Sequence, residues 1–170
     1  MFDGVVLGVD PGLAVTGLAA VGPAAGGPHL RWSETVRTPG DLAEPLRLRR
    51  VYQAVWEALT RHRAAALAVE RVMWGRNVGS ALSVARATGV VLLAAADAGV
   101  PVEEYAPLEV KMAVTGVGNA GKDQVRRALA TMHRLGNVPT QPDAADAVAV
   151  ALCHVQQSRM RELVRGTARA

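Results

Sequence analysis

Four acidic residues stand where their type and spacing could do chemistry: Asp10, Glu70, Asp143 and Asp146. Asp10 and Glu70 each end an apolar run with the pattern of a buried strand. If these strands are parallel neighbours, both acids lie at the same edge of a sheet, where the functional groups of α/β proteins gather. Because burying an unpaired carboxylate is costly, Asp10 is hard to explain as an ordinary strand residue.

Asp143 and Asp146 follow Pro142 at the start of a long helical pattern. A spacing of three residues puts both carboxylates on one face of the first helical turn. Proline at a helix entry and aspartate in a first turn are also ordinary helix-start chemistry. Taken alone, this pair is therefore explained equally well by a catalytic role or by a helix end.

Together, the four carboxylates predict a site for divalent cations. Carboxylate oxygens are hard ligands that suit Mg²⁺ or Mn²⁺, and we expect two ions per active site. Such a pair of ions activates water and stabilises the departing oxygen when a phosphodiester is hydrolysed. Neither a cysteine-rich zinc site nor a histidine cluster competes, because the chain has one cysteine and its histidines are scattered. We expect Cys153 to be a small apolar filler, and His154 to be a packed or surface residue.

The elements that must position the acids follow from the periodicity. We predict strands at residues 5–10, 13–21, 30–36, 65–69 and 101–105, a loop at 24–28, and helices around 46–59 and at 80–98, 122–135 and 143–163. The first three strands are joined by turns and therefore form an antiparallel start. The order predicts an α/β protein with a mixed five-stranded sheet and helices on both faces.

Length and composition bound the class of protein. The 170 residues fit one domain at 1–158, followed by a basic tail at 159–170 that we expect to be partly disordered. No apolar run is long enough to cross a bilayer, and no secretory signal is apparent. With a single cysteine, these features lead us to expect a cytoplasmic protein with no membrane partner.

The basic residues favour a polyanionic partner. The formal net charge is +4, and it becomes +8 outside the site if four carboxylates are assigned to metal ions. A surface with that excess attracts phosphate backbones. Lys111 and Lys122 are the only lysines beside seventeen arginines, and they flank a glycine-containing segment at 115–121.

Three segments carry a family resemblance: VVLGVDPGLAVTG (5–17), VERVMWGRNVGSAL (69–82) and QPDAADAVA (141–149). They resemble, in the same order, the RuvC family of crossover junction endodeoxyribonucleases, which resolve Holliday junctions, and the resemblance covers about residues 4 to 157. It implies a ribonuclease H-like nuclease domain in which Asp10, Glu70, Asp143 and Asp146 are the catalytic, metal-binding acids. It also implies a homodimer that makes paired symmetric nicks in four-way junction DNA during recombination and repair. The implied partners are a branch-migration helicase and its junction-binding subunit.

The resemblance also implies DNA contacts. Lys111 and Lys122 match basic residues that contact substrate phosphates. We expect the Gly116–Gly121 stretch between them to be a mobile loop over DNA. Met73 stands where the family often has an aromatic residue that stacks on junction bases, and Trp74 either supplies that stacking or packs as a half-buried indole. Arg76 and Asn77 are candidate backbone contacts.

Three other functions are possible for a chain with these acids, and each makes a different demand on the sequence. Another ribonuclease H-type nuclease, acting on branched or hybrid nucleic acid, would share the same acids. A catalytically inactive junction-binding protein would normally have lost one of the four acids, and all four are present. An actin-like ATPase needs a second related domain, for which 170 residues leave no room. The apolar helix at 80–98 is either a dimer interface or part of the core.

Overall fold

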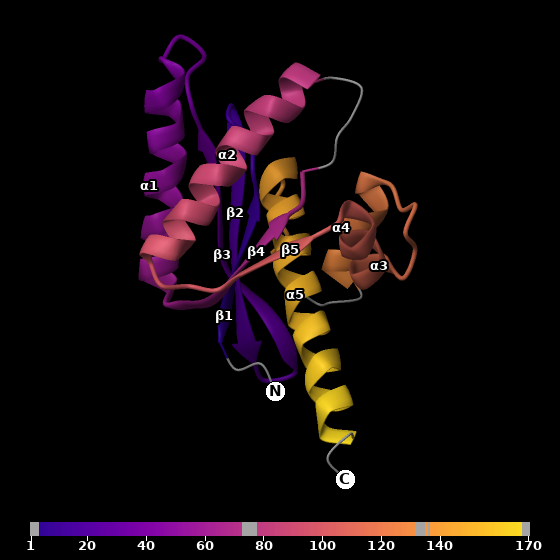
Figure 1. Cartoon of the computed structure of the whole chain (residues 1–170). Helices are drawn as coiled ribbons and strands as arrows, with labels where there is room; N and C mark the ends of the chain where they lie inside the picture. The colour runs from indigo at the N-terminus through magenta and orange to yellow at the C-terminus, as the bar shows by residue number, and fades with distance from the viewer. Residues whose placement is uncertain (1–3, 73–77, 132–134, 136, 168–170) are drawn as a thin grey trace.

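The computed structural model describes residues 4–72, 78–131, 135 and 137–167 (Figure 1). The strands are β1 (Val5–Asp10), β2 (Val15–Ala24), β3 (Gly27–Arg37), β4 (Ala64–Glu70) and β5 (Val102–Tyr105). The helices are α1 (Glu44–His62), α2 (Val78–Asp97), α3 (Pro107–Thr115), α4 (Lys122–Thr131) and α5 (Pro142–Thr167).

The five strands form one mixed sheet in the order β3-β2-β1-β4-β5. β1 pairs antiparallel with β2, and β2 pairs antiparallel with β3. β4 runs parallel to β1 on its other side, and β5 runs parallel to β4. The predicted mixed five-stranded sheet with an antiparallel three-strand start is confirmed.

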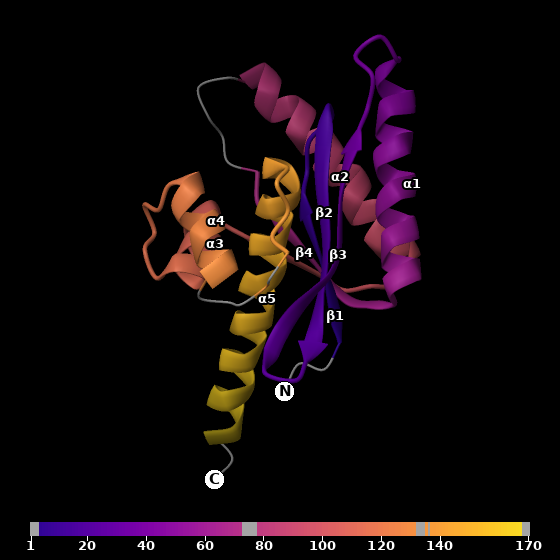
Figure 2. The same ribbon diagram turned by 180° about the vertical axis from the view of Figure 1, so that it is seen from behind.

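Helices cover both faces of this sheet. α1 and α2 lie on one face, and α5 crosses the other with α3 and α4 packed beyond it (Figures 1 and 2). Because strand side chains alternate, Leu7 and Val9 of β1 pack into the core under α1 and α2. Val6, which precedes Leu7 and points to the opposite face, joins the core under α5. The sheet therefore separates two hydrophobic cores.

Helix α5 lies directly against the backbone of the two central antiparallel strands. A Cβ atom placed on Gly17 of β2 would overlap the carbonyl oxygen of Asp143. One placed on Gly8 of β1 would overlap the carbonyl oxygen of Ala147 and lie 2.8 Å from the Cβ of Ala151. These two positions need glycine because the helix comes too close for any side chain.

A buried polar pair ties α5 to the edge of the sheet. Tyr105 at the end of β5 shares a 2.9 Å hydrogen bond with Nδ1 of His154 on α5, and both side chains are buried. His154 is thus the packed histidine that the sequence analysis allowed for. Cys153 beside it is fully buried, as expected of an apolar filler.

The structure corrects the predicted loop at 24–28. The β2–β3 ladder continues to the pairs Pro23↔Pro28 and Ala24↔Gly27. Gly26 and Gly27 take positive φ angles, which lets the chain reverse in a tight turn. Glycine and proline therefore mark a hairpin here, and both strands extend further than predicted.

The region between β5 and α5 also differs from the prediction. α3 lies outside the predicted helices, because Pro107, which follows the strand predicted at 101–105, begins a helix. The N–H of Ala106 donates to the Glu109 carboxylate at 2.7 Å, and Gly116 ends the helix in the left-handed region. Leu135 lies outside α4, so the helix predicted at 122–135 was drawn too long. No helix in the described ranges is long and apolar enough to cross a membrane.

The close approach of α5 generates a stability prediction. Gly17→Ala should lower the free energy of unfolding by about 1–3 kcal/mol, because the added methyl group must push Asp143 and the helix away from β2. Gly40→Ala is the matched control, since no atom lies within 4 Å of a Cβ at that exposed position. Urea unfolding measures both. Equal stability of the two variants would contradict the close-packing argument.

Candidate active site

The strand register places the first two acids side by side. β1 and β4 are parallel and pair through Val9↔Val69, so Asp10 and Glu70 follow at the same end of adjacent strands. Val9 and Val69 both pack into the core under α1 and α2. The next residue on each strand therefore faces α5. The sequence analysis placed both acids at one sheet edge on the condition that these strands are parallel neighbours, and the structure meets that condition.

The hairpin after Asp10 is held by residues whose roles were not recognised from the sequence. The hydroxyl of Thr16 donates to the carbonyl of Gly12 at 2.7 Å across the turn. Asp10 is paired with Gly17 in the antiparallel ladder, and Gly17 is the residue that admits the backbone of Asp143. The DPG and TG parts of the motif thus place Asp10 next to the start of α5. The Thr16-Gly17 dipeptide was the sequence feature from which these two roles could have been predicted.

The other two acids come from the first turns of α5. The helix begins at Pro142, and the N–H of Ala145 donates to the carbonyl of Gln141 at 3.1 Å. Asp143 and Asp146 are half-buried, whereas Ala144 and Ala145 between them are buried. The spacing of three residues therefore presents both carboxylates toward the end of β1.

Electrostatic interactions show that the four acids share one site. Burial and the negative charges of Asp146, Glu70 and Asp143, in that order, raise the pKa of Asp10 to about 7, and the Lys122 ammonium opposes this shift. Burial, followed by the charge of Asp146, raises the pKa of Glu70, and the ammonium groups of Lys122 and Lys111 act against it. The structure thus brings together all four predicted acids and both lysines.

Lys122 is the direct partner of the acid cluster. Lys122 is the first residue of α4, and its ammonium donates a 3.0 Å hydrogen bond to Oδ2 of Asp146. This hydrogen bond, and then the negative charge of Asp146, raise the pKa of Lys122. Lys111, on α3, is close enough to the same site for its positive charge to act on the pKa of Glu70. The four other candidate DNA contacts, Met73, Trp74, Arg76 and Asn77, lie outside the described residues.

The donor set fits a divalent cation. All four groups are carboxylates, and hard oxygen ligands are those that Mg²⁺ and Mn²⁺ prefer. Burial, and then repulsion among the carboxylates, raises the pKa of Asp10, and a bound cation would relieve that repulsion. As the side chains stand, no three histidine, cysteine or acidic groups in the described part of the chain lie close enough to enclose an ion. The acids would therefore have to draw together around the cation, with Lys122 giving up its contact with Asp146.

The fold and the site define a class of protein. A mixed five-stranded sheet, with acids at the ends of β1 and β4 and at the start of a helix that crosses them, is the arrangement of a ribonuclease H-like nuclease. The comparisons agree with this class. Thermus thermophilus RuvC in complex with a Holliday junction substrate is 38% identical with a TM-score of 0.86, covering 92% of this chain and 96% of that chain. A second structure of the same protein has a TM-score of 0.82 with the same identity and coverage.

Sequence comparison gives the family. Residues 6–154 match the family described as crossover junction endodeoxyribonuclease RuvC. The protein of that name from Syntrophomonas wolfei is 40% identical over 163 residues, which are 96% of this chain and 95% of the relative. The chain belongs to the RuvC family.

The raised pKa of Asp10 generates a prediction about stability and pH. The folded chain holds the Asp10 proton more tightly than the unfolded chain, in which aspartate titrates near 4. The stabilisation is therefore complete below about pH 4 and is lost as the pH rises through the folded pKa of about 7. Asp10→Asn should thus stabilise the metal-free protein by about 2–4 kcal/mol at pH 8 and have little effect at pH 4.

Chemical denaturation in the presence of a chelator measures this difference. Glu57→Gln, at an exposed position on α1, controls for the loss of one negative charge. The change in the free energy of unfolding caused by Asp10→Asn could instead be the same at pH 4 and pH 8. That result would show that burial and the neighbouring acids do not raise the pKa of Asp10.

Proposed function

We propose that this protein is a structure-selective DNA endonuclease that resolves four-way junctions by paired symmetric nicks, in homologous recombination and DNA repair. Its membership of the RuvC family supports the substrate class, since a relative of 38% identity is described in complex with a Holliday junction substrate. The observation that carries the chemistry is the single electrostatic cluster of four carboxylates and two lysines.

Asp10, Glu70, Asp143 and Asp146 would hold two Mg²⁺ or Mn²⁺ ions in each active site. When bound, such ions supply Lewis-acid chemistry for phosphodiester hydrolysis: a nucleophile at neutral pH and charge neutralisation on the reacting phosphate. The protein's own contribution is to fix the acids on rigid elements. Two lie at strand ends and two on the first turns of a helix packed against those strands, so packing holds the backbone that carries the four acids, and their side chains would draw together around the cations.

Lys122 has a second role once cations bind Asp146. Its side chain is 76% exposed, and its ammonium lies at the site, so the flexible stem can turn to a substrate phosphate without losing core packing. Lys111 approaches from α3, on the Glu70 side. We propose that both contact phosphates next to the cleaved bond, and that Met73, Trp74, Arg76 and Asn77 contribute further DNA contacts.

A homodimer supplies the two active sites that paired nicks require. We propose that the outer face of α2 forms its interface. The inner face of α2 packs in the core through Ala87, Val91, Ala94 and Ala95. Its outer face exposes Leu82 and Leu93, which keep 48% and 53% of their accessible surface, and between them lie Ala85, Gly89 and Arg86, which is paired with Glu44 of α1. The sequence left this helix as either interface or core, and its two faces fit both descriptions.

We also propose the cellular setting that the family resemblance implies. The protein acts in the cytoplasm beside a branch-migration helicase and its junction-binding subunit. Its nuclease domain comprises residues 1–158, and residues 159–170 form a basic tail, of which α5 includes the part up to Thr167.

A cleavage assay tests the proposal. Labelled four-way junction, matched linear duplex and RNA–DNA hybrid are incubated with Mg²⁺, with Mn²⁺ or with chelator. Symmetric metal-dependent nicks confined to the junction support a resolvase. Equal cutting of duplex or hybrid would instead identify another ribonuclease H-type nuclease, and tight binding without cutting in either metal would identify a junction-binding protein.

Removing one acid should separate cutting from binding. Glu70→Gln or Asp146→Asn is expected to lower the cleavage rate at least about 1,000-fold while changing junction affinity less than about threefold, because metal ligation is lost and basic surface is kept. Single-turnover cleavage and fluorescence anisotropy measure the two effects. Glu57→Gln, at an exposed position on α1 and across the sheet from α5, should leave both unchanged (Figure 1). Full cutting by Asp146→Asn would refute the four-carboxylate site.

The dimer proposal has its own prediction. Leu93→Glu should shift the protein from dimer to monomer at micromolar concentration, because it places a charge in an apolar interface. Leu108→Glu alters a leucine of similar exposure on α3 and should leave the dimer intact. Sedimentation velocity distinguishes the species, and a stable Leu93→Glu dimer would place the interface elsewhere.

A further inference from the structure

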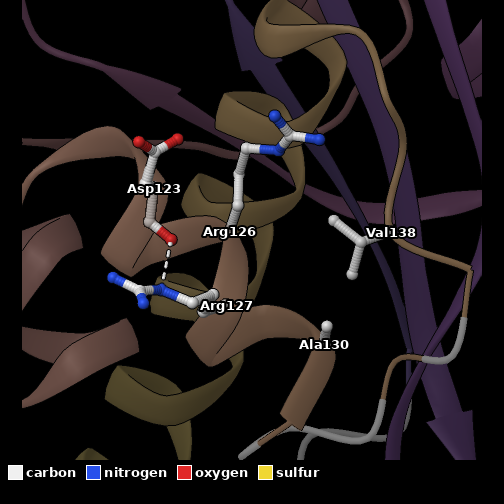
Figure 3. Close-up of a pocket in the computed structure, with 5 residues that line it drawn as sticks. All are labelled: Asp123, Arg126, Arg127, Ala130 and Val138. Atoms are coloured by element: carbon white, nitrogen blue, oxygen red, sulfur yellow. Dashed lines mark hydrogen bonds between the residues drawn. The ribbon is translucent and has the colours of Figure 1, made fainter.

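An open groove with two arginines lies along α4, next to the acid cluster. It has a volume of about 630 Å³ and runs between α4 and the segment that leads into α5 (Figure 3). Its lining consists of Asp123, Arg126, Arg127, Ala130 and Val138. The lining starts at Asp123, one residue after Lys122, so the groove lies on the same helix as the lysine that contacts Asp146.

The two arginines in this groove are in different states. Nε of Arg127 donates to the backbone carbonyl of Asp123 at 3.4 Å, which turns its side chain back along its own helix. Arg126 is exposed and makes no side-chain hydrogen bond or ion pair with any residue that the structure describes. Its guanidinium points to the Val138 side of the groove, whereas Arg127 and the Asp123 carboxylate lie on the other side (Figure 3).

An unpaired guanidinium at this place suits a phosphate. Arginine presents five N–H donors in a planar fork that matches two phosphate oxygens, and it is always charged. The Asp123 carboxylate does not compete for Arg126, because it lies on the Arg127 side. The structure therefore leaves one free phosphate-binding group in a groove that opens to solvent.

The position of Arg126 on the helix sets which phosphate it can reach. Lys122 and Arg126 are four residues apart, so they share one face of α4 and lie about 6 Å apart along its axis. Successive phosphates of one DNA strand advance about 3.4 Å along a duplex. When Lys122 contacts the phosphate that is cut, Arg126 is thus within about two phosphates of it.

We infer that Arg126 binds a backbone phosphate of the cleaved strand, one or two nucleotides from the cut, and that the groove beside α4 guides this strand away from the acids. The inference rests on the proposed nuclease function and deepens it. Arg126 is a positioning residue: it holds the strand in register with the site and takes no part in bond breaking.

The first test compares two variants that lose the same charge from neighbouring positions. Junction binding is measured in Mg²⁺ between 0.05 and 0.3 M salt (roughly the range in which phosphate contacts dominate), with Glu70→Gln present in every protein to prevent cutting. Arg126→Gln should weaken binding about 3- to 10-fold at 0.1 M salt and reduce the slope of log affinity against log salt by about one per bound protomer. Arg127→Gln should change affinity less than about twofold and leave the slope unchanged.

The second test locates the phosphate. Junctions carry a single uncharged methylphosphonate at each of the two positions on either side of the mapped cut. At the phosphate that Arg126 contacts, the losses of binding free energy caused by the methylphosphonate and by Arg126→Gln should not add, because either change removes the same interaction. At the other positions the two effects should add.

Each outcome decides the inference. Equal slope changes for the two arginine variants would show a diffuse charge effect, and additive losses at every phosphate would show that Arg126 contacts none of them; either result overturns it. If the chain cuts junctions normally while Arg126→Gln binds unchanged, the inference fails and the proposed function stands. A chain that neither binds nor cuts junctions overturns both.

Discussion

The site depends on how closely helix α5 approaches the sheet. The helix rests on the backbone of β1 and β2, at Gly8 and Gly17, with carbonyl oxygens of Asp143 and Ala147 where side chains would otherwise stand. A helix held at the usual distance from a sheet could not bring the acids of its first turn next to an acid in the strand. Because Gly17 is also the ladder partner of Asp10, one glycine links the strand acid to the helix acids.

This arrangement costs folding free energy, because it buries carboxylates that repel one another. Burial and three neighbouring carboxylates raise the pKa of Asp10 to about 7, so at neutral pH the metal-free site keeps a proton or carries a strained charge. The Lys122 ammonium on Asp146 offsets part of the repulsion. The Tyr105–His154 hydrogen bond joins α5 to β5, where Tyr105 is the ladder partner of Glu70, and so supports the packing that carries the acids. Divalent cations would replace Lys122 as the positive charge, which frees the lysine for the substrate.

The sequence predicted the features that depend on local residue type and spacing. Apolar runs ending in Asp10 and Glu70 predicted two strands that would bring the acids to one sheet edge if they were parallel neighbours, and β1 and β4 are parallel neighbours. The i, i+3 spacing predicted that Asp143 and Asp146 share a face of α5. The isolation of Lys111 and Lys122 marked two residues that the structure places at the acids.

Other features depend on contacts between distant segments, which periodicity does not report. The need for glycine at Gly8 and Gly17 comes from a helix more than a hundred residues later in the chain. Tyr105 gave no signal of its partner His154, 49 residues away. α3 was missed because proline both ends strands and begins helices, and only the Ala106–Glu109 hydrogen bond and the Gly116 helix end identify which occurred. The different states of Arg126 and Arg127 are likewise visible only in the packed structure.

The central claim is that acids from β1, β4 and α5 form one metal site. Titration of the full chain with Mn²⁺, followed by electron paramagnetic resonance, tests it most directly. The account predicts saturable binding of two ions per protomer that is weakened at least about tenfold by Asp10→Asn, Glu70→Gln and Asp143→Asn alike, and left unchanged by Glu57→Gln. If binding survives the loss of an acid from any one of the three elements, the acids do not act as a single site and the account is contradicted.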